Sequence, residues 1–259
     1  MTTAATLLIG LCAGLHAASY GAYKDSPHEN FKPRRYVREL VIATTCAAWM
    51  AVSGLGDGQG PLVLYLSIFA LARIATEFWK LFLRVEPQEG YRIPTQIHFF
   101  SRVVHNPAGR VLFGAGFVGA IYGYYALCTL LPNDLPFWLR GLVVGGGIGV
   151  CEALAGAYKD GSIEGFSWRK FAKSPTFGAL GGLIASAQTQ ALGFLLLAAI
   201  GSMRMFLELF FKILVPGYVP GKFRSMSGPF TRWAWQRRFF LVPYTTTWVL
   251  YVVWLARTV

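Results

Sequence analysis

Long apolar stretches alternate with short polar segments along the whole chain. Eight stretches have roughly the length that crosses the core of a bilayer as a helix. They cover residues 4–23, 40–55, 61–83, 111–131, 136–157, 175–190, 191–214 and 239–256. The pattern therefore predicts an all-α polytopic membrane protein with about eight transmembrane helices.

A second pattern along the chain is a repeated sequence. Residues 21–31 recur as residues 156–166, 135 positions later, with seven of eleven residues identical. Flanking glycines and basic residues match at the same spacing. Self-similarity at a fixed distance indicates internal duplication. We therefore predict two tandem four-helix repeats, residues 1–132 and 133–259.

Composition and charge indicate the environment and the topology. Apolar residues make up 54% of the chain and charged residues 14%, which is typical of a membrane protein. Of the 24 Lys and Arg residues, 20 fall within segments 24–38, 80–110, 158–173 and 212–238. The positive-inside rule then places these segments in the cytoplasm and both termini on the non-cytoplasmic side. An even number of helices per half gives the two repeats a parallel orientation.

The repeated motif Gly-Ala-Tyr-Lys-Asp has two interpretations. In the structural one it ends a helix, with the tyrosines at the membrane interface and Asp25 and Asp160 capping the helices that follow. In the functional one, cationic side chains at headgroup depth bind phosphate, and carboxylates orient them. The residues of this predicted inner-face site are Lys24, Asp25, Glu29 and Arg34 in the first half, and Lys159, Asp160, Glu164 and Arg169 in the second.

Charged residues also lie inside the predicted spans. Arg73 and Glu77 are one helical turn apart, and Arg204 and Glu208 repeat this spacing 131 positions later. A single charge at this depth costs several kcal/mol, whereas a pair one turn apart can neutralise itself. The alternatives are an internal ion pair in each helix and a polar substrate or ion path between the halves. The unduplicated acid Glu152 is a third candidate, either as a protonatable group or as a partner of Arg73 or Arg204.

Glycines recur at four-residue spacing in the first and fifth spans. Gly10 and Gly14 correspond to Gly145 and Gly149, and Gly141 extends the second row. Small residues at this spacing let helices approach closely in lipid. We therefore expect the first and fifth helices to form the central contact between the repeats.

The segment from Val215 to Phe240 is basic and aromatic and contains no acidic residue. This composition is typical of an interfacial segment that lies on anionic lipid. Its candidate lipid-facing residues are Lys222, Arg224, Arg232, Arg237 and Arg238.

Other signatures are missing from the sequence. The four cysteines and four histidines lack metal-site or redox spacing, and we expect no metal, no cofactor and no ligand cluster among the histidines. No recognised nucleophile motif is present, which weighs against catalysis without excluding an enzyme. The net charge of +12 reflects topology and anionic lipid, so we expect no nucleic acid partner.

Three functional classes follow from these patterns. The favoured hypothesis is a transporter, channel or lipid translocator with a polar site between homologous halves and an anionic or phosphate-bearing substrate. The alternatives are a structural subunit of a larger membrane complex and a lipid-modifying membrane enzyme. Expected partners are anionic membrane lipids, together with a second copy of the chain or other subunits of a membrane complex.

Overall fold

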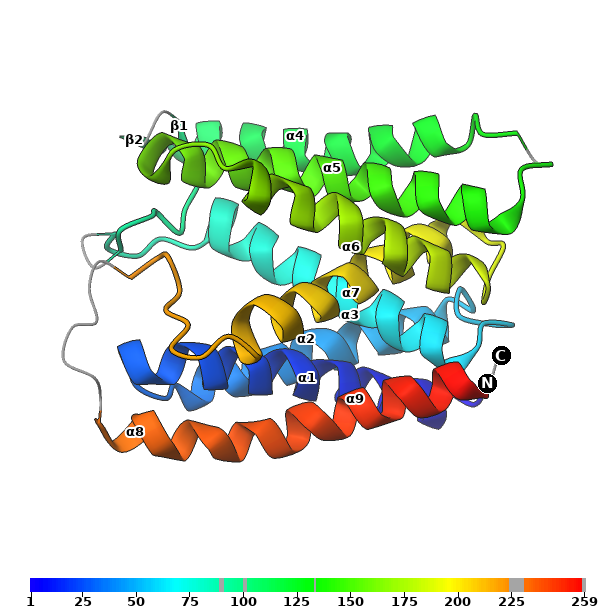
Figure 1. Ribbon diagram of the computed structural model, residues 1–259, viewed down its shortest axis with the longest axis horizontal. Helices are drawn as coiled ribbons and strands as arrows, with labels where there is room; N and C mark the ends of the chain where they lie inside the picture. The colour runs from blue at the N-terminus through cyan, green and yellow to red at the C-terminus, as the bar shows by residue number, and fades with distance from the viewer. Residues whose placement is uncertain (89–90, 100–101, 133, 224–230, 258–259) are drawn as a thin grey trace. The chain divides into compact units, whose positions relative to one another are not determined.

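The structure is a computed structural model that describes residues 1–259 except 89–90, 100–101, 133, 224–230 and 258–259, and excluding the side chains of Thr231 and Arg232. Helices dominate it (Figure 1). The elements in chain order are α1 (Thr3–Glu29), α2 (Pro33–Val52), α3 (Pro61–Phe78), η1 (Trp79–Leu83), β1 (His98–Phe99), β2 (Arg102–Val103), α4 (Pro107–Cys128), α5 (Phe137–Glu164), α6 (Trp168–Ser186), α7 (Leu192–Glu208), η2 (Leu209–Ile213), α8 (Thr231–Gln236), η3 (Arg237–Phe240) and α9 (Leu241–Ala256). The short elements η1 and η2 are π-helical turns that continue α3 and α7, and η3 is a 3-10 turn.

Within the described residues, six helical runs are long and apolar enough to cross a membrane. They are Thr3–Glu29, Pro61–Leu83, Pro107–Cys128, Phe137–Glu164, Leu192–Ile213 and Trp233–Ala256. These runs indicate a multi-pass membrane protein. The predicted stretches 40–55 and 175–190 lie largely in α2 and α6, whose first turns carry several charged residues. The number of eight spans therefore stays a prediction.

The chain forms two compact units. The first unit comprises Met1–Arg73, Arg204–Pro220 and Met226–Val259, and the second comprises Ile74–Met203 and Gly221–Ser225. The first unit thus combines residues from both predicted halves. The division of the sequence at residue 132 concerns the repeat and stays a prediction.

Both glycine rows pack against the next helix in the chain. A Cβ atom added to Gly14 in α1 would lie 2.8 Å from the Cα atom of Leu40 in α2, and one added to Gly145 in α5 would lie 2.8 Å from the Cα atom of Gly182 in α6. Such distances leave no space for a side chain. The expectation that the rows join α1 to α5 is therefore wrong, because their close partners are α2 and α6.

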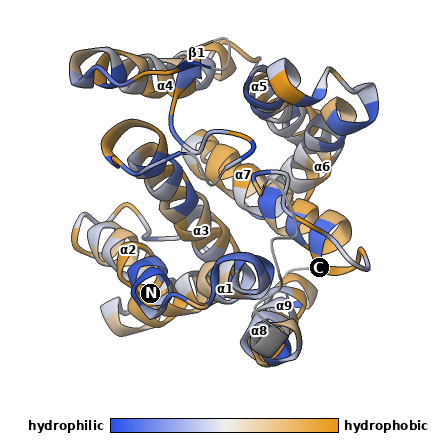
Figure 2. Ribbon diagram, turned by 90° about the vertical axis from the view of Figure 1, so that its left-hand side faces the viewer, coloured by the Kyte–Doolittle hydropathy of each residue, from blue (hydrophilic) through white to orange (hydrophobic). Residues whose placement is uncertain are grey.

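The repeated motif lies inside helices and does not begin the helices that follow. Helix α1 continues through Asp25 to Glu29, and α5 continues through Asp160 to Glu164. The N-cap residues of α2 and α6 are Lys32 and Ser167, and the Ser167 hydroxyl accepts a hydrogen bond from the Lys170 amide. The predicted capping by Asp25 and Asp160 is therefore wrong. In Figure 2 the end of α1 that faces the viewer is hydrophilic.

Candidate functional site

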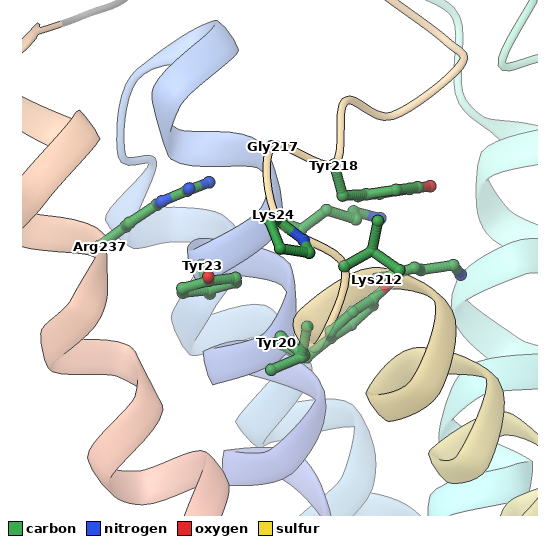
Figure 3. A pocket seen from close by; sticks show the side chains of 10 residues that line it. Tyr20, Tyr23, Lys24, Lys212, Gly217, Tyr218 and Arg237 are labelled. Carbon is green, nitrogen blue, oxygen red and sulfur yellow. The ribbon is translucent and has the colours of Figure 1, made fainter.

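A pocket of about 130 Å³ lies in the first unit, at the C-terminal end of α1 (Figure 3). Four segments contribute to it: α1, η2, the stretch that follows η2, and η3. The lining residues are Tyr20, Tyr23, Lys24, Lys212, Ile213, Val215, Pro216, Gly217, Tyr218 and Arg237. Three of them are cationic, and none of these described lining residues is acidic. The pocket is therefore suited to an anion.

Each of the three cations lies against an aromatic ring. The ammonium nitrogens of Lys24 and Lys212 lie 5.0 and 5.5 Å from the centre of the Tyr20 ring. The guanidinium carbon of Arg237 lies 4.7 Å from the centre of the Tyr23 ring. Cation–π contacts of this length stabilise a cation in a partly desolvated place and leave its N–H groups available to an acceptor. Figure 3 shows the three cationic side chains around the same space.

Local sequence explains how the pocket residues converge. Tyr20, Tyr23 and Lys24 are spaced three and four residues apart, so they share one face of α1. Gly217 has a φ of 67°, which a glycine adopts readily and which turns the chain back over the pocket after Pro216.

Aromatic packing positions Arg237. The rings of Trp233 and Phe240 lie 5.2 and 5.1 Å from the ring of Phe31, just after α1. Ring pairs at this distance are favourable. They fix the start of the last helical run beside α1, and Arg237 lies between them in sequence.

A buried polar cluster lies deeper along the same helices. His16 in α1, Glu208 in α7 and Thr247 in α9 are 0%, 1% and 1% exposed. His16 Nδ1 is 2.8 Å from Thr247 Oγ1, and His16 Nε2 is 3.6 Å from Glu208 Oε2. Arg73 Nη2 in α3 is 3.7 Å from Glu208 Oε1. The cluster therefore joins four helices of the first unit.

Aromatic side chains surround His16. The rings of Phe69 and Tyr244 lie 4.9 and 4.7 Å from its imidazole, and those of Tyr65 and Trp248 lie 6.5 and 6.3 Å away. Such an apolar surrounding strengthens every electrostatic interaction inside it.

The cluster and the pocket are connected through two helices. Residues His16, Tyr20 and Lys24 follow one another at four-residue steps on α1, and Glu208 precedes Lys212 by four residues. The hydroxyl of Tyr20 is buried and has no hydrogen-bond partner among the described residues. Polar side chains therefore continue from the pocket to the cluster.

The structure brings together some of the predicted buried charges. Arg73 and Glu208 meet although they come from different predicted halves, and Arg204 lies on the same helix as Glu208, one turn earlier. Glu77 pairs with Lys80 at 2.9 Å. Glu77 and the partly exposed Glu152 belong to the second unit. Pairing inside each helix stays a prediction.

The predicted inner-face residues divide between the two units. Lys24 lines the pocket, and Asp25 Oδ1 is 3.6 Å from its ammonium nitrogen. Glu29 pairs with Lys32 at 2.9 Å and also with Arg35. Arg34 is exposed on α2.

The second half of the motif has its own contacts. Glu164 pairs with Lys170 and lies 3.3 Å from Arg92. The carbonyl of Lys159 is 3.2 Å from His98 Nε2, Asp160 is partly exposed, and Arg169 is exposed.

The predicted basic segment is likewise divided. Arg237 lines the pocket, Arg238 is exposed, and the ammonium of Lys222 lies 4.7 Å from the ring of Phe223 in the second unit. Arg224 and the side chain of Arg232 lie outside the described residues.

The sequence patterns did not indicate several residues of the pocket and of the cluster, among them His16, Tyr20, Lys212 and Thr247. The sequence assigned no role to His16, because its partners are 192 and 231 positions away in sequence, on α7 and α9. One signal was present: His16, Tyr20 and Lys24 lie at four-residue spacing, which places them on one face of a helix. No pattern in the sequence indicated that Glu208 and Thr247 are the partners of His16.

Comparison with protein-family models, curated proteins and solved structures finds no match to this chain.

Proposed function

We propose that the protein is an integral membrane transporter or lipid translocator that binds a phosphate-bearing anion in the pocket formed by Lys24, Lys212 and Arg237. The observation that carries this proposal is the convergence of three cations from separate elements on one space, with no acid among the described lining residues. Lys and Arg are the side chains that bind phosphate best, through charge-assisted hydrogen bonds. A lipid headgroup and a soluble phosphate share this chemistry.

The buried polar cluster supports movement of the substrate rather than simple binding. Ionisable residues inside membrane-spanning helices are costly and commonly line substrate or ion pathways. Here Arg73, Glu208 and His16 lie in such helices, directly beyond the pocket along α1 and α7. The site also contains residues from both predicted halves of the sequence, as the substrate sites of carriers built from two repeats do.

We also propose that the chain consists of two tandem repeats with both termini on the non-cytoplasmic side. Several parallels support the repeat. Helices α1 and α5 have 27 and 28 residues, and each is followed by a C-cap residue with positive φ, Asn30 and Gly165 respectively. The pairs Glu29–Arg35 and Glu164–Lys170 occupy equivalent positions. Both α3 and α7 continue into a π-helical turn.

The proposed topology predicts a labelling pattern. A cysteine introduced at Gln59 should react with an impermeant maleimide in intact cells, and one at Lys32 only after permeabilisation. Both are compared with the parent chain, which carries its four natural cysteines. Labelling of Lys32→Cys alone in intact cells would reverse the orientation.

The test of the pocket is a binding and flux measurement. Purified protein is mixed with inorganic phosphate, or placed in nanodiscs with and without phosphatidic acid, and binding is read from calorimetry and thermal stabilisation. The double variant Lys24→Gln/Arg237→Gln should bind at least about tenfold more weakly, since each lost charged hydrogen bond is worth about 1.5–3 kcal/mol. Arg257→Gln, a residue exposed at the end of α9, is the matched control.

Flux separates the two substrate sources. Uptake of radiolabelled phosphate into proteoliposomes indicates a soluble anion, and movement of fluorescent phosphatidic acid between leaflets indicates a lipid. A folded natural chain that binds and moves neither would contradict the proposal and favour a structural subunit.

A lipid-modifying enzyme is the second candidate, because Thr247, His16 and Glu208 form a row of hydroxyl, imidazole and carboxylate. This row resembles a nucleophile with its base and orienting acid. However, the Thr247 hydroxyl also lies 2.7 Å from the Tyr244 carbonyl, to which it donates, and the residue is 1% exposed. A nucleophile needs an accessible oxygen, so this geometry weighs against Thr247 as a nucleophile.

A further inference from the structure

The hydrogen bonds of Thr247 determine which nitrogen of His16 carries a proton. A threonine hydroxyl has one proton to donate, and a carbonyl can only accept. Thr247 Oγ1 is 2.7 Å from the Tyr244 carbonyl oxygen and 2.8 Å from His16 Nδ1. The hydroxyl therefore donates to the carbonyl, and Nδ1–H donates to the hydroxyl. This tautomer is assigned from the hydrogen-bond pattern.

The second nitrogen of His16 then faces an acceptor. In a neutral imidazole whose Nδ1 is protonated, Nε2 is an acceptor with a lone pair. Glu208 Oε2, 3.6 Å away, is also an acceptor, so two lone pairs face each other with no proton between them. Neither atom makes a hydrogen bond within the described part of the chain. Buried polar atoms without partners are costly, and a structural histidine ordinarily satisfies both ring nitrogens. One added proton would satisfy both atoms at once.

We propose that His16 and Glu208 form a proton-binding site that is coupled to the anion pocket, so that the protein takes up a proton together with its phosphate-bearing substrate. This inference rests on the proposed function and names the ion that would accompany the substrate. The proton would be held between His16 Nε2 and Glu208 Oε2.

The surrounding charges explain the coupling. Arg73 already balances the carboxylate of Glu208, so an added proton gives the cluster a net positive charge. The pocket beyond it carries the cations Lys24, Lys212 and Arg237. Titratable and charged groups on the elements packed around His16 are Tyr20 on α1, the pair Arg38–Glu39 on α2, Tyr65 and Arg73 on α3, Glu208 and Lys212 on α7 and η2, and Tyr244 on α9.

An anion in the pocket changes this balance. Lys24 lies eight residues from His16, a rise of about 12 Å along a helix. A unit charge at about 12 Å and an effective dielectric constant of about 20 changes a proton affinity about tenfold. Anion binding should thus strengthen proton binding about tenfold, and by linkage a lower pH should strengthen anion binding by the same factor.

The experiment measures phosphate binding and proton uptake together. Calorimetry with inorganic phosphate, in buffers of different ionisation enthalpy, compares the natural chain with His16→Asn between pH 6 and pH 8. The titration of phosphate itself is common to both proteins and cancels. We expect the ratio of their phosphate affinities to rise about tenfold from pH 8 to pH 6, with proton uptake that the variant lacks. His105→Asn, an exposed histidine in the second unit, is the matched control.

A second variant of His16 and a parallel series with lipid complete the experiment. His16→Gln is the second variant, and whichever variant folds is used for the comparison. Nanodiscs with phosphatidic acid replace inorganic phosphate in a parallel series, so that linkage seen only there assigns the substrate to a lipid headgroup. If the natural chain binds neither source, the proposed function itself fails. If binding is present but proton uptake is equal in the natural chain and the His16 variant, only the coupling is overturned.

Discussion

Replacement of Arg73 by Met is expected to destabilise the protein by about 3 kcal/mol, because it leaves the buried carboxylate of Glu208 without its cation. Arg73 Nη2 is 3.7 Å from Glu208 Oε1, and Glu208 is 1% exposed. Removing one partner of a buried pair costs far more than removing both, since the remaining charge stays in a low-dielectric place. Chemical unfolding in detergent measures the loss.

The double variant Arg73→Met/Glu208→Gln distinguishes pairing from other roles. It should be more stable than the sum of the single changes predicts, with a coupling of about 1–2 kcal/mol. Full additivity would mean that the contact contributes nothing to folding.

We also expect the double variant to fold and to lose phosphate flux. Retained flux would remove Arg73 and Glu208 from the transport path.

Replacement of Gly145 by Ala should destabilise the second unit by about 2–3 kcal/mol, a typical cost of overpacking. A Cβ atom at this position would collide with the carbonyl of Gly178 and lie 2.8 Å from the Cα atom of Gly182. Both contacts are backbone, so no side chain can rotate away and the two helices must separate.

The neighbouring glycine is the control for this change. A Cβ atom at Gly146 would meet the Cβ atom of Ala179 at 3.6 Å, an ordinary contact. Gly146→Ala should therefore be neutral, or stabilising by up to about 1 kcal/mol through helix propensity. Equal unfolding midpoints for the two variants would show that α5 and α6 do not pack through Gly145.

Local sequence patterns indicated the six long apolar helical runs and drew attention to some residues of the candidate site. Apolar length predicted about eight spans, and six described helical runs are long and apolar enough to cross a membrane, because length and composition are local properties. The cost of a charge in lipid drew attention to Arg73 and Glu208, which lie 3.7 Å apart, and the repeated motif drew attention to Lys24, which lines the pocket. Each of these patterns can be recognised from a short stretch of sequence, without knowledge of how the chain folds.

Long-range pairings were beyond the sequence. The four-residue spacing between Arg73 and Glu77 indicates that the two side chains share one face of a helix. It does not indicate which other helix packs against that face. In the structure the partner of Arg73 is Glu208, at the end of α7. The same limit explains the glycine rows. Their spacing predicted close packing correctly, whereas the partners, α2 and α6, depend on how the chain folds back on itself.

The π-helical turn η2 makes the anion pocket sensitive to chain length. A π-turn contains one residue more than an α-turn, so it changes the direction in which every later side chain points. Lys212 lies within this turn, four residues after Glu208. Loss of one residue between them would restore a regular helix and rotate Lys212 by about 100° away from its present direction. The spacing of the two charges along the chain is therefore as much a part of the site as their identities, and single-residue insertions or deletions there would change it more than many substitutions.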